Sequence, residues 1–99
     1  MFYILKDRVP VESSAEEWGA WLSRHMKERR AAKTVVGDVE VSTVFLGLDH
    51  SFDGLGMLVF ETMSFGIMRD HDQITVRCRT WQEAELIHRE VCNEVSREQ

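Results

Sequence analysis

The sequence predicts an α+β fold, a mostly antiparallel sheet of about four to five strands with two helices packed on one face. Two capping-box patterns each precede an amphipathic stripe, and short apolar runs rich in β-branched residues lie between them. The chain has 99 residues, of which 43% are hydrophobic and 29% charged. That length and composition fit a single domain over residues 1–99. The expected element order is β-α-β-β-β-β-α.

The amino-terminal part predicts one strand and one helix. Phe2–Lys6 is an apolar run with aromatic and β-branched residues, and Pro10 is expected to end it. Ser14 and Glu17 then form a capping box. Apolar and aromatic residues follow at helical spacing: Trp18, Trp21, Leu22, His25 and Met26. A helix is therefore expected over residues 15–31, with its basic end at the negative pole of the helix dipole.

The remaining chain predicts four strands and a final helix. The expected strands are residues 34–36, 39–46, 57–65 and 74–80. Gly37 and Asp38 separate the first two strands, and this order favours a type II′ hairpin turn. Thr80 caps an apolar stripe that predicts a helix over residues 81–96. An alternative parallel start, with the first helix crossing between strands, remains open.

The charge distribution favours a protein partner over nucleic acid. Twelve basic residues against seventeen acidic ones give a net charge of −5, and residues 34–66 contain no Lys or Arg. Because phosphate neutralisation dominates nucleic-acid affinity, direct nucleic-acid binding is not expected. The candidate contacts for a partner with a basic surface are Asp38, Glu40, Asp49 and Asp53. A solvated acidic face is the alternative.

Membrane and cofactor signals are not found in the sequence. No run of apolar residues is long enough for a transmembrane helix, and the start lacks the pattern of a signal peptide. Cys78 and Cys92 form no CxxC pair, so we expect two reduced thiols. We therefore expect a cytoplasmic protein without a cofactor or membrane association.

Four polar residues are candidates for chemistry. His88 lies on the apolar stripe of the last helix, Glu61 lies within a strand, and Asp49 and His50 follow another strand. Three interpretations stay open. The residues satisfy one another in the core, or they bind a metal, since histidine and carboxylate suit a divalent ion. In the third, Glu61 and His88 act as a general acid–base pair.

The expected strand register decides which of these residues meet. If Phe65 pairs with Ile74, Glu61 lies opposite Cys78. A simple hairpin between the preceding strands would place Thr43 across from Glu61. In this register the neighbouring strand's arginines, Arg77 and Arg79, point to the other face.

Three segments together carry a family resemblance: VSTVFLGLDHSF (41–52), LVFETMSFG (58–66) and RTWQEAELIH (79–88). Over roughly residues 34–90 they resemble small uncharacterised bacteriophage and prophage proteins, in which a TVFLGLDH strand and loop precedes an LFETMVFG strand and a TWEEAEAGH helix start. The positions singled out by the resemblance are Asp49, His50, Glu61, Thr62, Trp81, Glu83, Ala84 and His88. The chain departs from the family at Ser64, Ile67 and Ile87. The resemblance implies a phage origin and no chemistry.

Three functions are therefore considered. The first is a phage-type accessory protein that acts by protein binding through an acidic surface, such as an inhibitor of a host defence complex of the anti-CRISPR kind. The second is a small metal-dependent or acid–base enzyme using His50, Glu61 and His88. The third is a structural protein that self-associates, for example as a homodimer, through Trp18, Trp21 or an exposed strand edge.

Overall fold

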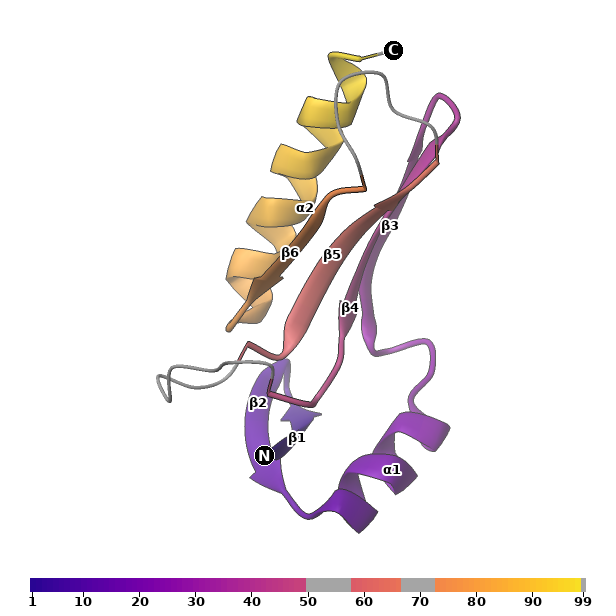
Figure 1. Cartoon of the computed structure of the whole chain (residues 1–99). Helices are drawn as coiled ribbons and strands as arrows, with labels where there is room; N and C mark the ends of the chain where they lie inside the picture. Colours follow the sequence, from indigo (N-terminus) through magenta and orange to yellow (C-terminus); the bar gives the residue numbers. More distant parts are fainter. Residues whose placement is uncertain (50–57, 67–72, 99) are drawn as a thin grey trace.

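The computed structural model describes residues 1–49, 58–66 and 73–98 (Figure 1). Its elements are, in order, β1 (Phe2–Lys6), β2 (Val9–Ser13), α1 (Ala15–Arg24), β3 (Arg30–Val36), β4 (Val39–Phe45), β5 (Phe60–Phe65), β6 (Thr75–Cys78) and α2 (Trp81–Ser96). The strands form two antiparallel sheets, a β1–β2 hairpin and a four-stranded meander in the order β3-β4-β5-β6. The α+β class is thereby confirmed.

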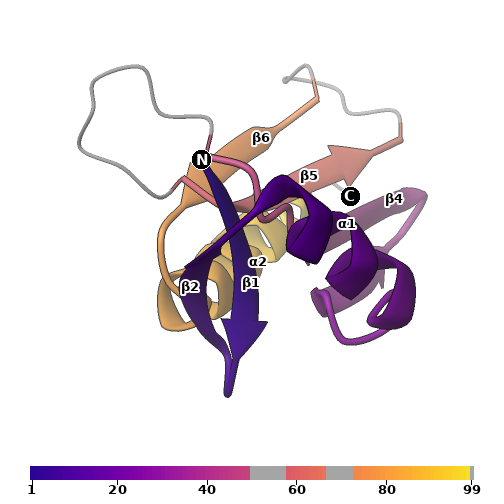
Figure 2. The same ribbon diagram turned by 90° about the horizontal axis from the view of Figure 1, so that it is seen from below.

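The two helices do not share one sheet face, which differs from the expectation. Helix α2 lies along one face of the four-stranded sheet and contacts all of its strands. Helix α1 instead packs beside the β1–β2 hairpin, at the end of the sheet where β4 finishes (Figures 1 and 2). The molecule therefore has a helix-covered sheet at one end and a smaller hairpin-and-helix unit at the other. Neither described helix is long and apolar enough to cross a membrane.

Strand β2 differs from the expectation that Pro10 only ends the preceding strand. In the structure Pro10 lies inside β2, opposite Leu5 of β1. A two-stranded sheet leaves one edge of each strand unpaired, so a residue without an N–H is tolerated there. The connecting residues Asp7 and Arg8 have φ angles of 50° and 66°. Two consecutive left-handed residues make a type I′ turn, for which glycine and asparagine are the usual signal.

Helix α1 is shorter than the expected span over residues 15–31. It begins with the expected capping box, in which Ser14 accepts from the Glu17 N–H, and it ends at Arg24. Part of the expected helix is instead strand β3, which pairs with β4 from Arg30 onward. The pairing with β4 and the contact of β3 with α2 override the local helix preference of this basic segment.

The four-stranded sheet buries one face and leaves the other open. The buried side chains alternate along β4 and β5 and face α2: Val39, Val41, Thr43, Phe45, Phe60, Thr62 and Ser64. From α2 the fully or nearly fully buried residues are Trp81, Ala84, His88, Val91 and Val95. Between β3 and β4, Gly37 has a φ of 60° and the turn contains two residues. The expected type II′ turn is therefore confirmed.

Candidate functional site

His88 is bonded to hydroxyl groups on both sides of its ring. It is 5% exposed on the sheet-facing side of α2. Its Nδ1 lies 2.8 Å from the Thr43 Oγ1, and its Nε2 lies 2.9 Å from the Thr34 Oγ1. The Thr43 hydroxyl also lies 2.6 Å from the hydroxyl of Thr62. One ring nitrogen donates and the other accepts, so the neutral ring is fully satisfied by the sheet.

Burial favours the neutral form of this histidine. Desolvation lowers the pKa of His88 below its ordinary value, because the charged ring would lose its hydration. Both ring nitrogens already have partners within the fold. His88 therefore joins α2 directly to β3 and β4, and through the Thr43 hydroxyl to β5, and both of its ring nitrogens are occupied.

Glu61 lies on the other face of the sheet from His88. The observed register pairs Glu61 with Arg77 and Phe60 with Cys78, one residue away from the expected pairing of Glu61 with Cys78. The buried Phe60 and Cys78 thus meet each other, and the two charged residues meet on the open face. Arg77 Nε donates to the Glu61 carboxylate at 3.0 Å.

The same register correction applies to the neighbouring hairpin. Thr43 pairs with Thr62, and Val44 takes the place opposite Glu61 that was expected for Thr43. Because successive side chains alternate between faces, Glu61 and His88 are separated by the sheet. The structure does not bring them together as an acid–base pair.

Asp49 takes part in holding the amino terminus to the sheet. Its backbone N–H donates to the Met1 carbonyl at 3.1 Å, and its carboxylate accepts from the Leu58 N–H at 3.3 Å. His50 lies outside the described residues. Within residues 1–49, 58–66 and 73–98, no group of three His, Cys, Asp or Glu side chains could hold a metal ion, so Asp49, Glu61 and His88 form no such group.

The acidic residues expected to bind a partner do not gather at one place. Asp38 lies in the turn before β4 and Asp49 lies beyond its far end, so a strand of 7 residues, about 20 Å long, separates them. Glu40 forms an ion pair of 3.1 Å with Lys33. Asp53 lies outside the described residues.

The two cysteines are free thiols of unequal exposure. Cys78 is buried and Cys92 is partly exposed. Burial, with a smaller contribution from Glu83, raises the pKa of Cys78 to about 11. The thiol therefore stays protonated near neutral pH and is a poor nucleophile.

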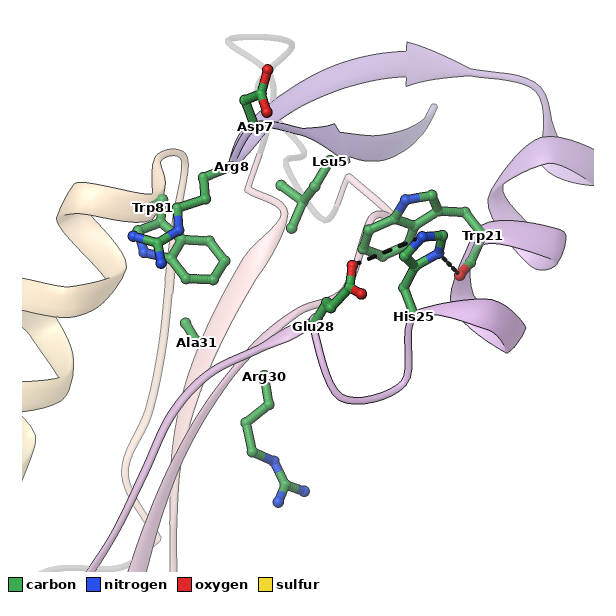
Figure 3. A pocket seen from close by; sticks show the side chains of 9 residues that line it. All are labelled: Leu5, Asp7, Arg8, Trp21, His25, Glu28, Arg30, Ala31 and Trp81. Atoms are coloured by element: carbon green, nitrogen blue, oxygen red, sulfur yellow. Dashed lines mark hydrogen bonds and ion pairs between the residues drawn. The ribbon is translucent and has the colours of Figure 1, made fainter.

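A cleft of about 560 Å³ lies between the β1–β2 turn, the end of α1, the start of β3 and the start of α2 (Figure 3). Its lining residues are Leu5, Asp7, Arg8, Trp21, His25, Glu28, Arg30, Ala31 and Trp81. Two tryptophans, two arginines, a histidine and two carboxylates thus surround one open space. The cleft is the candidate functional site.

One wall of the cleft is an arginine stacked on a tryptophan. The Arg8 guanidinium carbon lies 4.8 Å from the centroid of the Trp81 ring (Figure 3). Trp81 is the first residue of α2 and is 7% exposed. The guanidinium therefore rests on a ring fixed in the core, which is a favourable cation–π geometry.

The opposite wall is a second planar stack. The His25 and Trp21 rings lie 4.6 Å apart and nearly parallel, at 11°. His25 Nδ1 lies 2.8 Å from the Trp21 carbonyl oxygen, so Nδ1 carries the hydrogen. The His25 Nε2 then faces the Glu28 carboxylate at 3.8 Å.

A chain of aromatic contacts joins the two walls through the core. The successive ring pairs are Trp21–Phe45, Phe45–Phe60 and Phe60–Trp81, with centroids 5.5, 5.3 and 6.1 Å apart. Leu5 and Ala31 pack against the same cluster. Because the walls share one packed core, we expect their spacing to be well defined.

Sequence reasoning missed this cleft. Its residues come from four separate segments. The sequence patterns place Trp21 and His25 on the apolar stripe of the first helix, and of the lining residues they single out only Trp21 for a function, as a residue for self-association. Asp7 suits the first position of the turn, but Arg8 stands where glycine is usual, so the hairpin that brings Arg8 to Trp81 has only a weak sequence signal. Comparison with family models, curated proteins and solved structures gives no significant match.

Proposed function

We propose that this protein is a small accessory protein that acts by binding another protein, which it contacts at the cleft between Arg8 and Trp21. The composition of the cleft carries the proposal. Its tryptophans and arginines are the residue types that dominate binding energy at protein interfaces: Trp21, Trp81, Arg8 and Arg30. Lysine is depleted at interfaces and does not line the cleft.

The placement of the other polar residues favours binding over catalysis. His88 has a hydroxyl on each ring nitrogen, and Glu61 is paired with Arg77 on the far face of the sheet. An acid–base mechanism needs both groups within reach of one substrate. The cleft, in contrast, offers planar apolar surfaces next to charged groups without a nucleophile and base in contact.

The phage resemblance and the net charge extend the proposal to the kind of partner. A chain with a net charge of −5 associates fastest with a protein of positive net charge, and salt weakens such long-range attraction. We therefore propose a basic partner in the cytosol of the host cell, with a host defence complex as the specific example. Glu40 and the other acidic residues then contribute to attraction at a distance, while the cleft supplies the close contact.

Affinity capture with charge variants tests the proposal. The tagged protein is incubated with lysate of the host cell at low and high salt, together with Arg8→Gln, Arg30→Gln and the control Arg89→Gln. Arg89 is exposed on α2 and does not line the cleft, so its replacement removes the same charge elsewhere. We expect one partner to be captured by the wild type and by Arg89→Gln, less strongly at high salt, and to be lost from the two cleft variants.

Two outcomes contradict the proposal. The first is the absence of a specific partner at both salt concentrations. The second is equal capture of that partner by Arg8→Gln, Arg30→Gln and the wild type, with all proteins shown to be folded by circular dichroism.

Self-association is a second candidate function, favoured by the open face of the sheet. Val35 and Phe65 are 66% and 45% exposed there and flank Glu40 in the register. A second copy would cover this apolar surface. Sedimentation equilibrium of the wild type and Phe65→Ser distinguishes the two functions, because a dimer built on this face dissociates in the variant and a monomeric wild type excludes it.

A further inference from the structure

Arg8 has N–H groups that can bind an anion and that the described part of the chain leaves without a carboxylate partner. Its guanidinium stacks on Trp81, and within residues 1–49, 58–66 and 73–98 it makes no ion pair or hydrogen bond to a carboxylate. Asp7 is its neighbour in the chain, yet the Asp7 side chain points away from the guanidinium (Figure 3). Glu28 lines the same cleft but lies beside His25. Stacking on Trp81 therefore orients the guanidinium plane, while its N–H groups, which can donate two parallel hydrogen bonds to a carboxylate, bind no carboxylate among the described residues.

The backbone at Arg8 is unfavourable for its side chain. A φ of 66° in a type I′ turn suits glycine or asparagine, and the Cβ atom of another residue there costs free energy. Glycine would relieve this conformation and at the same time remove the guanidinium. Residues with an unfavourable backbone conformation cluster at functional sites, and the left-handed Arg8 lies at the cleft.

The start of α2 adds a favourable field for an anion. Trp81 is the first residue of the helix, so the ring on which the Arg8 guanidinium stacks belongs to the first turn, at the positive end of the helix dipole. Thr80 caps the helix through the Glu83 N–H. The pole supports an anion held by Arg8 and does not bind one by itself.

The rest of the cleft fits an apolar group beside that anion. Leu5 and Ala31 pack against the core cluster, and the Trp21–His25 stack faces the Arg8 side across the cleft (Figure 3). The Glu28 carboxylate on the opposite wall repels a ligand with two negative charges more strongly than a ligand with one. A carboxylate, with one charge, is therefore favoured over a phosphate with two.

We infer that the cleft binds an acidic residue of the partner together with an adjacent bulky apolar residue. The carboxylate accepts from the N–H groups of Arg8, and the apolar side chain lies between the Trp81 wall and the Trp21 wall. This inference rests on the proposed function, because it names what the partner presents to the same cleft. The single carboxylate acts at contact distance, whereas the overall charge of the partner acts at longer range.

Titration with small probes tests the inference. Acetyl-Phe-Glu-amide, acetyl-Phe-Gln-amide and phenyl phosphate are added to the full chain, and the indole N–H resonances of Trp21 and Trp81 are followed by NMR. We expect saturable shifts with the glutamate probe, with a Kd on the order of 1 mM, and at least tenfold weaker binding of the glutamine probe. Arg8→Gln should lose the response, and Arg89→Gln should keep it.

Arg8→Gly separates binding from folding. Glycine adopts the left-handed turn without strain, so the variant should keep the melting temperature of the wild type and still lose the glutamate probe. Equal shifts with the glutamate and glutamine probes, unchanged binding by the Arg8 variants, or tighter binding of phenyl phosphate would each overturn the inference.

The outcomes distinguish this inference from the proposed function. If Arg8→Gln loses the partner but the glutamate probe does not bind, the carboxylate inference is wrong and the proposed function stands. If the probe binds as expected while the cleft variants still capture the partner, the carboxylate site stands and the proposed function is wrong.

Discussion

Two histidines occupy opposite situations in this molecule. His88, under α2, has a threonine hydroxyl on each ring nitrogen and is almost fully buried. His25, at the end of α1, stacks on Trp21 at the rim of an open cleft, with Nδ1 bonded to the Trp21 carbonyl and Nε2 3.8 Å from the exposed Glu28 carboxylate. The comparison shows that a histidine on an apolar stripe can be a buried structural residue, as His88 is, or can line a cleft that a ligand can reach, as His25 does.

The largest effect is expected from removing His88. His88→Ala leaves a cavity and deprives Thr34 and Thr43 of their partner, so the free energy of unfolding should fall by about 3 kcal/mol. His25→Ala should cost less than about 1 kcal/mol, because that ring is partly exposed. Chemical denaturation of both variants measures the difference. Similar losses of unfolding free energy for His88→Ala and His25→Ala would contradict the assignment of only His88 to a structural role.

A smaller loss is expected from the hydroxyl at the centre of the network. Thr43→Val keeps the shape of the side chain but removes the group that joins His88 to Thr62. We expect a cost of about 1–3 kcal/mol from the unpaired groups left behind. Thr75→Val, at an exposed position of β6, is the matched control and should be nearly neutral. The denaturant midpoints of both variants, measured with an unchanged m-value, check this prediction. A Thr43→Val variant as stable as the wild type would contradict a stabilising role for the His88–Thr43–Thr62 hydrogen bonds.

Acid should weaken the fold through His88. Its pKa is lowered in the folded state by burial, so the unfolded chain binds the proton more tightly. The stabilisation is thus complete above about pH 6.5, the ordinary histidine pKa, and is lost as the pH falls below it. Denaturation across this range measures the slope, with His88→Gln as the comparison. If the unfolding free energy of His88→Gln changes with pH as steeply as that of the wild type, groups other than His88 cause the acid sensitivity.

The smallest effect on stability is expected at the cleft. Arg8→Gly relieves a left-handed residue but loses the stacking on Trp81, and these contributions are each about 1 kcal/mol and opposite in sign. The melting temperature should change by only a few degrees. A large drop in melting temperature would make Arg8 a structural residue like His88 and remove the contrast between the two regions.

The sequence predicts the class of this fold, the final helix and the β3–β4 turn well. Thr80 marks the start of α2, and Gly37–Asp38 marks the β3–β4 turn, because capping and turn chemistry are local. The β1–β2 hairpin escaped prediction since its turn, Asp7–Arg8, contains neither glycine nor asparagine. The end of α1 was misplaced because β3 forms only through pairing with β4.

The candidate site was less predictable than the fold. A shift of one residue in the β5–β6 register decides whether Glu61 meets Cys78 or Arg77, and local patterns do not specify that register. The cleft depends on Arg8 and Trp81, which are far apart in the chain and meet only after the hairpin docks. His88 was identified as unusual, but its threonine partners lie on strands whose faces could not be assigned beforehand.

The burial of Cys78 makes the two thiols of the protein differ in their reactivity toward labelling reagents. With a pKa of about 11 and a buried sulfur, this thiol should resist maleimide at neutral pH, while the partly exposed Cys92 on α2 reacts. A fluorophore can thus be attached at one chosen position without mutagenesis. Since Cys92 lies more than two helical turns from Trp81, such a label would test the proposed docking of a partner at the cleft from outside the cleft itself.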